Sequence, residues 1–195
     1  MNITKRPPEP FGGFFTSNQK TKFKFFMKKL SIIFLAVAAC FFALPSHAQA
    51  KRTSPKAEAN GVVGGAKVEI VYCRPSADKR KIMGELVPFG EVWRTGANAA
   101  TTIEFDKPVK IEGNSIPAGK YALFTIPNEN EWTIIFNKEF NQSGAYNYDQ
   151  KKDILRVKVK PKKTATYIET FTIVPEKDKV KLQWENTEVA FKVKG

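Results

Sequence analysis

Hydrophobic and polar residues alternate along most of the chain from Gly61 onward. Between residues 67 and 73, for example, Val68, Ile70 and Tyr72 fall on one face. A period of two is typical of half-buried β-strands. Such segments lie at 67–73, 101–105, 109–112, 120–126, 132–136, 153–160, 167–173, 180–184 and 189–193. We therefore predict an all-β domain over residues 61–195, a single sandwich or barrel-like fold of roughly nine short antiparallel strands.

Residues 72–102 depart from this alternation. They hold three arginines, three glycines, Trp93 and Asn98 within a short stretch that lacks a regular period. Glycine and proline interrupt regular structure, so we predict one long Arg/Gly-rich loop here. Because the rest of the chain reads as plain strand and turn, any site of this protein is expected on this loop.

The N-terminal part of the sequence has the pattern of an export signal. A basic start at Met27 precedes an almost unbroken apolar run over residues 30–44, and small residues end the segment at Ala50. Cleavage near Ala50 would make the protein periplasmic or secreted and leave it no membrane span. Cys40 leaves a lipoprotein signal open as the alternative, because Val-Ala-Ala precedes it.

The expected organisation therefore has four parts. Residues 1–26 are an upstream extension that is not native, residues 27–50 are the signal peptide, residues 51–60 are a flexible polar tether, and residues 61–195 are the domain.

Removal of residues 1–50 limits the available chemistry. The chain carries a net charge of +13, and the part after residue 50 keeps 25 basic and 18 acidic residues, a net +7. The only histidine, His47, is lost, and Cys73 is left as the single cysteine. Histidine-dependent nucleophilic catalysis and zinc sites built on histidine or clustered cysteine are thereby excluded. No glycine motif for phosphate binding is present, so we expect no metal and no cofactor.

Two other functional classes have weak support. Glu85 and Glu91 flank residues 87–90, and a pair of carboxylates can hydrolyse a glycoside, although both also fit plain surface charge. Basic charge favours nucleic acid in general, but an exported protein would rarely meet it. An anionic polymer of the cell envelope is the better match, and we expect no nucleic-acid partner.

The long loop supplies five candidate ligand-binding residues. Arg74, Arg80 and Arg94 can each form paired hydrogen bonds with a carboxylate, phosphate or sulfate. Trp93 offers an aromatic plane of the kind that sugar faces favour, and Asn98 can donate and accept at once. The same residues also fit a structural role, in which arginines paired with nearby acids and a core tryptophan anchor the loop without a ligand. Both interpretations stay open.

Several motifs in and after this loop are shared with a known family. They read RPS at 74–76, RKIMG at 80–84, LVPFG at 86–90, VWRTGAN at 92–98, PAGKYALF at 117–124 and EWTIIFN at 131–137. Over residues 61–195 the sequence resembles the secreted bacterial family called domain of unknown function 2911. The resemblance implies a single exported β domain and no established activity or substrate. Members often carry a glutamate where this chain has Ala99, a departure that disfavours an enzyme.

We expect an exported, non-catalytic β-sandwich domain that binds a small anionic molecule or an envelope glycan at the five loop residues. One alternative is an envelope structural or assembly protein whose long loop docks a protein partner. The other is a hydrolase that uses Glu85 and Glu91.

Overall fold

The computed structural model describes residues 54–195. The predicted signal peptide, the segment upstream of it, Cys40 and residues 51–53 of the predicted tether lie outside this part. Within it no helix is long and apolar enough to cross a membrane.

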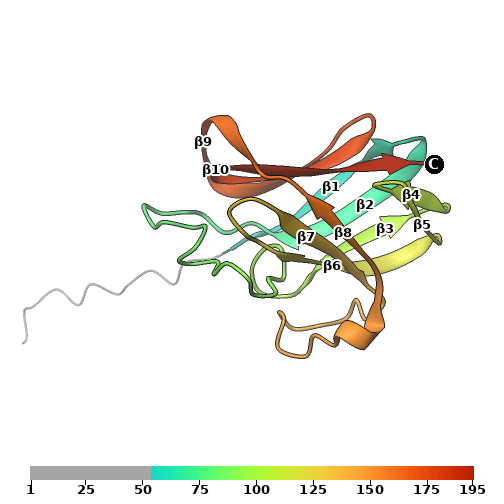
Figure 1. The fold of residues 1–195 in the computed structure, drawn as a ribbon, viewed down its shortest axis with the longest axis horizontal. Helices are drawn as coiled ribbons and strands as arrows, with labels where there is room; N and C mark the ends of the chain where they lie inside the picture. The colour runs from blue at the N-terminus through green and yellow to red at the C-terminus, as the bar shows by residue number, and fades with distance from the viewer. Residues whose placement is uncertain (1–53) are drawn as a thin grey trace, which may run out of the picture. The chain divides into compact units, whose positions relative to one another are not determined.

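Ten β-strands and one short 3₁₀ helix build the domain (Figure 1). They are β1 (Lys56–Val63), β2 (Ala66–Cys73), β3 (Thr101–Phe105), β4 (Val109–Ile111), β5 (Asn114–Ile116), β6 (Gly119–Ile126), β7 (Trp132–Asn137), η1 (Gln150–Lys152), β8 (Asp153–Val159), β9 (Lys162–Pro175) and β10 (Lys179–Lys194). The predicted all-β class is confirmed.

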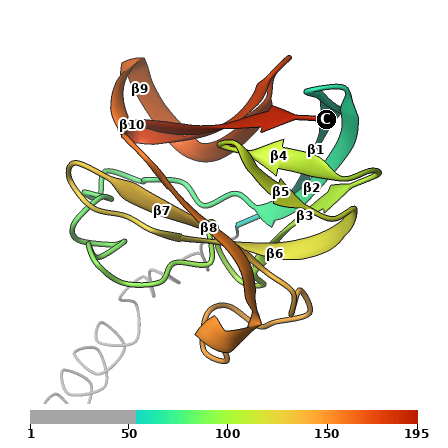
Figure 2. The same ribbon diagram turned by 45° about the vertical axis from the view of Figure 1, so that its right-hand side comes forward.

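The strands form two antiparallel sheets that pack face to face, and neither closes into a barrel (Figure 2). One sheet has six strands in the order β1-β2-β3-β6-β7-β8, and the other has four in the order β5-β4-β10-β9. A strand buries alternate side chains, so the predicted inward residues Val68, Ile70 and Tyr72 lie in the core between the sheets. The arrangement is a β-sandwich.

The C-terminal strands are longer than predicted. The segments 180–184 and 189–193, expected as two strands, belong to the single strand β10. Its pairing with β9 shifts register between Gln183 and Glu185 and again before Thr187, and Glu185 has a positive φ of 56°. A β-bulge interrupts the alternation of side chains without ending the strand, and this accounts for the difference.

The predicted tether is wrong for residues 56–60, which are the first part of β1. This strand pairs with β2 along its whole length, from Lys56 opposite Cys73 to Val63 opposite Ala66. Its half-buried positions hold the small residues Ala57 and Ala59, which pack against the main core. Alanine is only slightly more hydrophobic than its polar neighbours here, so the alternation was too weak to predict a strand.

Ala59→Asp is expected to destabilise the domain by about 1–3 kcal/mol, because it places a charge against the core beneath β1. Asn60→Asp is the matched control, since Asn60 is exposed on the same strand, and it should change stability by less than about 0.5 kcal/mol. Urea unfolding measures both. Equal, small effects would mean that residues 56–60 behave as a tether.

Candidate functional site

The long loop leaves β2 at Cys73 and returns to β3 at Thr101, at one end of the sandwich (green in Figure 1). Its first part pairs with β9 through a bridge between Ser76 and Thr170. Its last part pairs with β6 through a bridge between Trp93 and Thr125. The loop is therefore fastened to both sheets.

Two of the three arginines hold the loop together. Arg74 donates from Nε to the carbonyl oxygen of Phe171 at 3.2 Å and from Nη2 to Thr172 Oγ1 at 2.8 Å, which ties the loop to β9. Arg80 donates to the carbonyl oxygens of Ala77 at 3.0 Å and Ser76 at 2.7 Å, which closes a local turn. These neutral acceptors take up two of the five donors of each guanidinium group.

Trp93 packs against the core between the sheets. Its ring stacks on Trp184 with centroids 5.9 Å apart and planes at 18°, and it meets Trp132 and Phe171 edge-on. Its Nε1 donates to the carbonyl oxygen of Gly96 at 3.0 Å. The ring thus serves core packing and does not present an open plane to a sugar.

A tight turn follows Trp93 and carries Asn98. Thr95 and Asn98 have positive φ values of 55° and 58°. At Gly96 a Cβ atom would lie 2.9 Å from the carbonyl oxygen of Cys73, so a larger residue would push the turn away from β2. Asn98 is exposed and donates from Nδ2 to the carbonyl oxygen of Ser54 at 3.3 Å.

Arg94 differs from the other two arginines. Within residues 54–195 it forms no side-chain hydrogen bond and no ion pair, although its Nε is buried. Trp93 faces the main core, whereas Val92 packs against a second cluster. Because neighbouring side chains of an extended chain alternate, Arg94 lies on the same side as Val92.

That second cluster covers the outer face of the six-stranded sheet, and we call it the satellite cluster. Its buried members are Ala100, Ala122, Phe124 and Ile135. Ala145 and Tyr148, from the loop between β7 and β8, pack onto it. Of the two tyrosines in this loop, Tyr148 anchors it, whereas Tyr146 is 88% exposed.

A polar network beside the satellite cluster holds the same loop. The carboxylate of Asp153 accepts from Tyr148 Oη at 2.5 Å, from Arg156 Nε at 2.9 Å and from Asn137 Nδ2 at 2.8 Å. Burial of the Tyr148 phenol, followed by its hydrogen bond to Asp153, raises its pKa to about 12. A nearly buried carboxylate with three donors is well stabilised, so the network fixes the loop.

The five predicted binding residues are not gathered at one point. Arg74 belongs to the contact with β9, Arg80 to a local turn and Trp93 to the core, whereas Arg94 and Asn98 lie on the return to β3. Glu85 and Glu91 are both exposed, and Glu85 pairs with Lys81 at 3.3 Å.

Two pockets lie near candidate features. One, of about 360 Å³, opens on the outer face of the six-stranded sheet, and Cys73, Ala99, Thr102, Phe140 and Gln142 are among its lining residues. The other, of about 540 Å³, lies between the Gly64-Gly65 turn and the end of β10.

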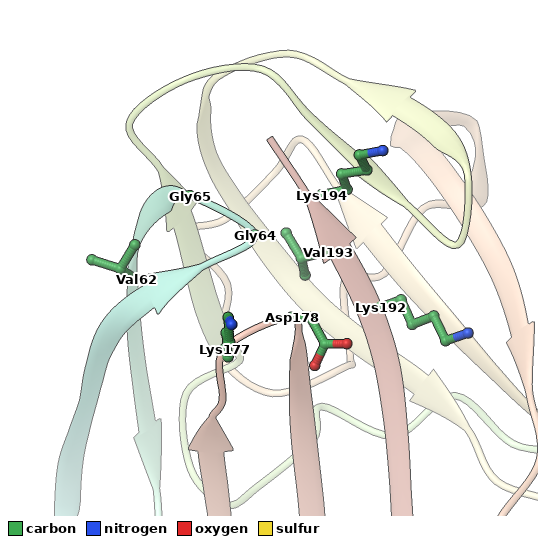
Figure 3. Close-up of a pocket in the computed structure, with 8 residues that line it drawn as sticks. All are labelled: Val62, Gly64, Gly65, Lys177, Asp178, Lys192, Val193 and Lys194. Carbon is green, nitrogen blue, oxygen red and sulfur yellow. The ribbon is translucent and has the colours of Figure 1, made fainter.

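The larger pocket holds three lysines and one acid. Figure 3 shows the amino groups of Lys192 and Lys194 directed away from Lys177, so the three charges do not converge on one point. Asp178 lies among them and offsets part of the positive charge. A site for an anion requires convergent donors, which this pocket lacks.

The comparisons with known proteins give one match. The family described as "Protein of unknown function (DUF2911)" matches residues 54–193. The chain belongs to the DUF2911 family. The match includes β1, so the DUF2911 domain of this chain begins before residue 61. Neither the curated proteins nor the solved structures contain a match to it.

Membership of the DUF2911 family assigns no role to individual residues, so their roles are inferred from the structure. In this DUF2911 domain Ala99, where the family resemblance led us to expect a frequent glutamate, lines the outer-face pocket. Sequence reasoning missed Asn137, Gln142 and Asp153, because the sequence does not show whether a polar side chain is buried or which partners it meets. The signal that could have found the region is the aromatic content of residues 139–152, since aromatic side chains in a loop can anchor it to the domain.

The DUF2911 domain is expected to lose stability between about pH 10 and 12, in part because of Tyr148. Its folded pKa lies above the ordinary 10.0, so its contribution is complete below pH 10 and is lost as the pH rises through the folded value. Tyr148→Phe should make the unfolding free energy fall less steeply with pH over this range. Tyr146→Phe, which removes an exposed phenol, is the control, and equal slopes in all three proteins would contradict the assignment.

Proposed function

We propose that this DUF2911 domain is an exported, non-catalytic β-sandwich that binds a small anionic or glycan ligand at the loop surface of Arg94 and Asn98. The observation that carries the proposal is the guanidinium of Arg94, which has a buried Nε and no acceptor among the described residues. Such a group is charged at every physiological pH and can donate five hydrogen bonds.

An unpaired buried donor is costly. Leaving one without an acceptor costs about 1–3 kcal/mol, and more for a charged group. Buried polar groups in folded proteins are nearly always paired, so exceptions mark places where another molecule can supply the partner. An oxyanion of a sugar acid, or a phosphate or sulfate ester, matches a guanidinium in both charge and geometry.

The scaffold role of the other loop residues supports a fixed geometry for Arg94. Arg74 and Arg80 secure the first half of the loop, and Trp93, the residue immediately before Arg94, is held between the sheets. A rigid backbone at this point limits the conformational entropy lost on binding to that of the Arg94 side chain itself. Asn98, exposed four positions later, has its Oδ1 available as an acceptor for a ligand hydroxyl.

A panel of sugar acids and of sulfated and phosphorylated sugars, tested by isothermal titration calorimetry, checks the proposal. At least one compound should bind, and Arg94→Gln should weaken it about tenfold or more, as expected for loss of a hydrogen bond to a charged group.

Lys79→Gln is the control, because it removes a positive charge from an exposed residue of the same loop. It should retain binding. Equal affinity of the wild type and Arg94→Gln, or no binding of any compound, would rule the proposal out.

A second candidate is docking of an envelope protein by the long loop. Leu86 and Phe89 favour it, since they are 43% and 37% exposed near the middle of the loop. Trp93 is not available for this role because it packs in the core. A tagged chain should then co-purify with an envelope protein, and the pair Leu86→Ser and Phe89→Ser should release it. Retention of the partner by that variant would exclude this contact.

A further inference from the structure

The outer-face pocket has the character of a small-molecule site. Val71 and Cys73 of β2 and Thr102 of β3 belong to the sheet beneath it, and the segments 99–100 and 140–142 contribute further lining. Its volume of about 360 Å³ suits a small ligand, and its lining is largely apolar with a few polar groups.

Gln142 gives this pocket an unpaired hydrogen-bond acceptor. The residue is 7% exposed and lines the pocket. Its backbone carbonyl accepts from the amide of Ala100 at 3.1 Å, and its Nε2 donates to the carbonyl oxygen of Glu139 at 2.5 Å. The carbonyl oxygen of Glu139 can only accept a hydrogen bond, so the side-chain atom of Gln142 that contacts it must be the donor, Nε2. Oε1 is therefore the buried atom without a partner.

We infer that the pocket binds a small apolar ring bearing a hydroxyl or N–H group, whose hydrogen bond Gln142 Oε1 accepts. An unpaired carbonyl oxygen repels a carboxylate and favours a donor, so the ligand is not an anion at this end. Lys56 also lines the pocket, but its side chain is exposed, so solvent screens its charge and it adds little preference for an anion.

Oε1 is itself buried, so a ligand must displace part of the pocket wall to reach it, and the lining residue best able to move is Phe140. This ring is 43% exposed, and it takes part in none of the aromatic contacts found within residues 54–195. Exposed side chains change rotamer rapidly and at little cost. Displacement of Phe140 by the ligand ring would replace one apolar contact by another.

This site is separate from the one proposed at Arg94. Arg94 is not among the residues that line the pocket, and the ligand chemistry differs, an uncharged donor here against an oxyanion there. Different variants test the two sites, so either proposal can fail while the other holds.

Cys73 lines the same pocket and allows a direct test. In the full chain carrying Cys40→Ser, Cys73 is the sole thiol. Its thiolate attacks a probe disulfide, forms a mixed disulfide and releases the other half of the probe as a thiol. Two probes are compared, a hydroxyphenylethyl disulfide and the matched phenylethyl disulfide, at equal concentrations of reductant, with the labelled fraction read by intact-mass spectrometry.

The hydroxyphenylethyl probe should label Cys73 about fivefold more favourably, the gain typical of one neutral hydrogen bond. Gln142→Met should remove this preference, since it keeps the length of the side chain and deletes the acceptor. Ala99→Leu should reduce labelling by both probes, because Ala99 is exposed and a larger side chain there fills the pocket without disturbing the core.

A hydroxyethyl disulfide too small to fill the pocket reports the intrinsic reactivity of the thiol in each variant and serves to normalise the data. Equal labelling by the two aromatic probes in the starting chain would overturn the inference. A preference that survives Gln142→Met would also overturn it, as would labelling that Ala99→Leu leaves unchanged.

Discussion

The position of Trp93 between the two sheets determines the shape of the long loop. Its ring stacks on Trp184 of the four-stranded sheet, while its backbone bridges to Thr125 of the six-stranded sheet. One residue thus fastens the returning chain to both layers of the sandwich. Since side chains alternate in extended backbone, the same placement turns Arg94 away from the main core, and the packing of the sandwich thereby sets the position of the proposed binding residue.

The strands were predictable because their signal is local. Alternation in β2 and β8 needs only a few neighbouring residues to be recognised, and burial follows from it. The strand at residues 56–60 was missed because Ala57 and Ala59, which face the core, are not hydrophobic enough to produce a clear alternation. The length of β10 was missed for another reason, since a bulge at Glu185 interrupts the period inside a continuous strand.

The residues of the loop were predictable as a set, but their division into roles was not. Arginine, tryptophan and asparagine are residue types that often bind ligands, and the sequence shows only that these types are present. Whether an arginine is free depends on acceptors brought by distant segments, and those of Arg74 lie 97 and 98 positions away on β9. Arg94 has the same side chain and no such partner within residues 54–195, a difference that only the tertiary structure reveals.

In the described part of the chain, two buried side-chain atoms without a partner belong to residues on either side of one short segment. Among residues 54–195, Arg94 Nε and Gln142 Oε1 are the buried side-chain polar atoms without a partner, one a donor and the other an acceptor. The carbonyl of Arg94 accepts from Thr101, and the carbonyl of Gln142 accepts from the adjacent Ala100. Elsewhere the buried polar side chains of the described part are paired, as at Asn137, so these exceptions are not a general looseness of packing. Both atoms belong to residues whose backbone carbonyls hold the segment 100–101, so each of the two proposed ligands would complete the hydrogen bonding on one side of that segment.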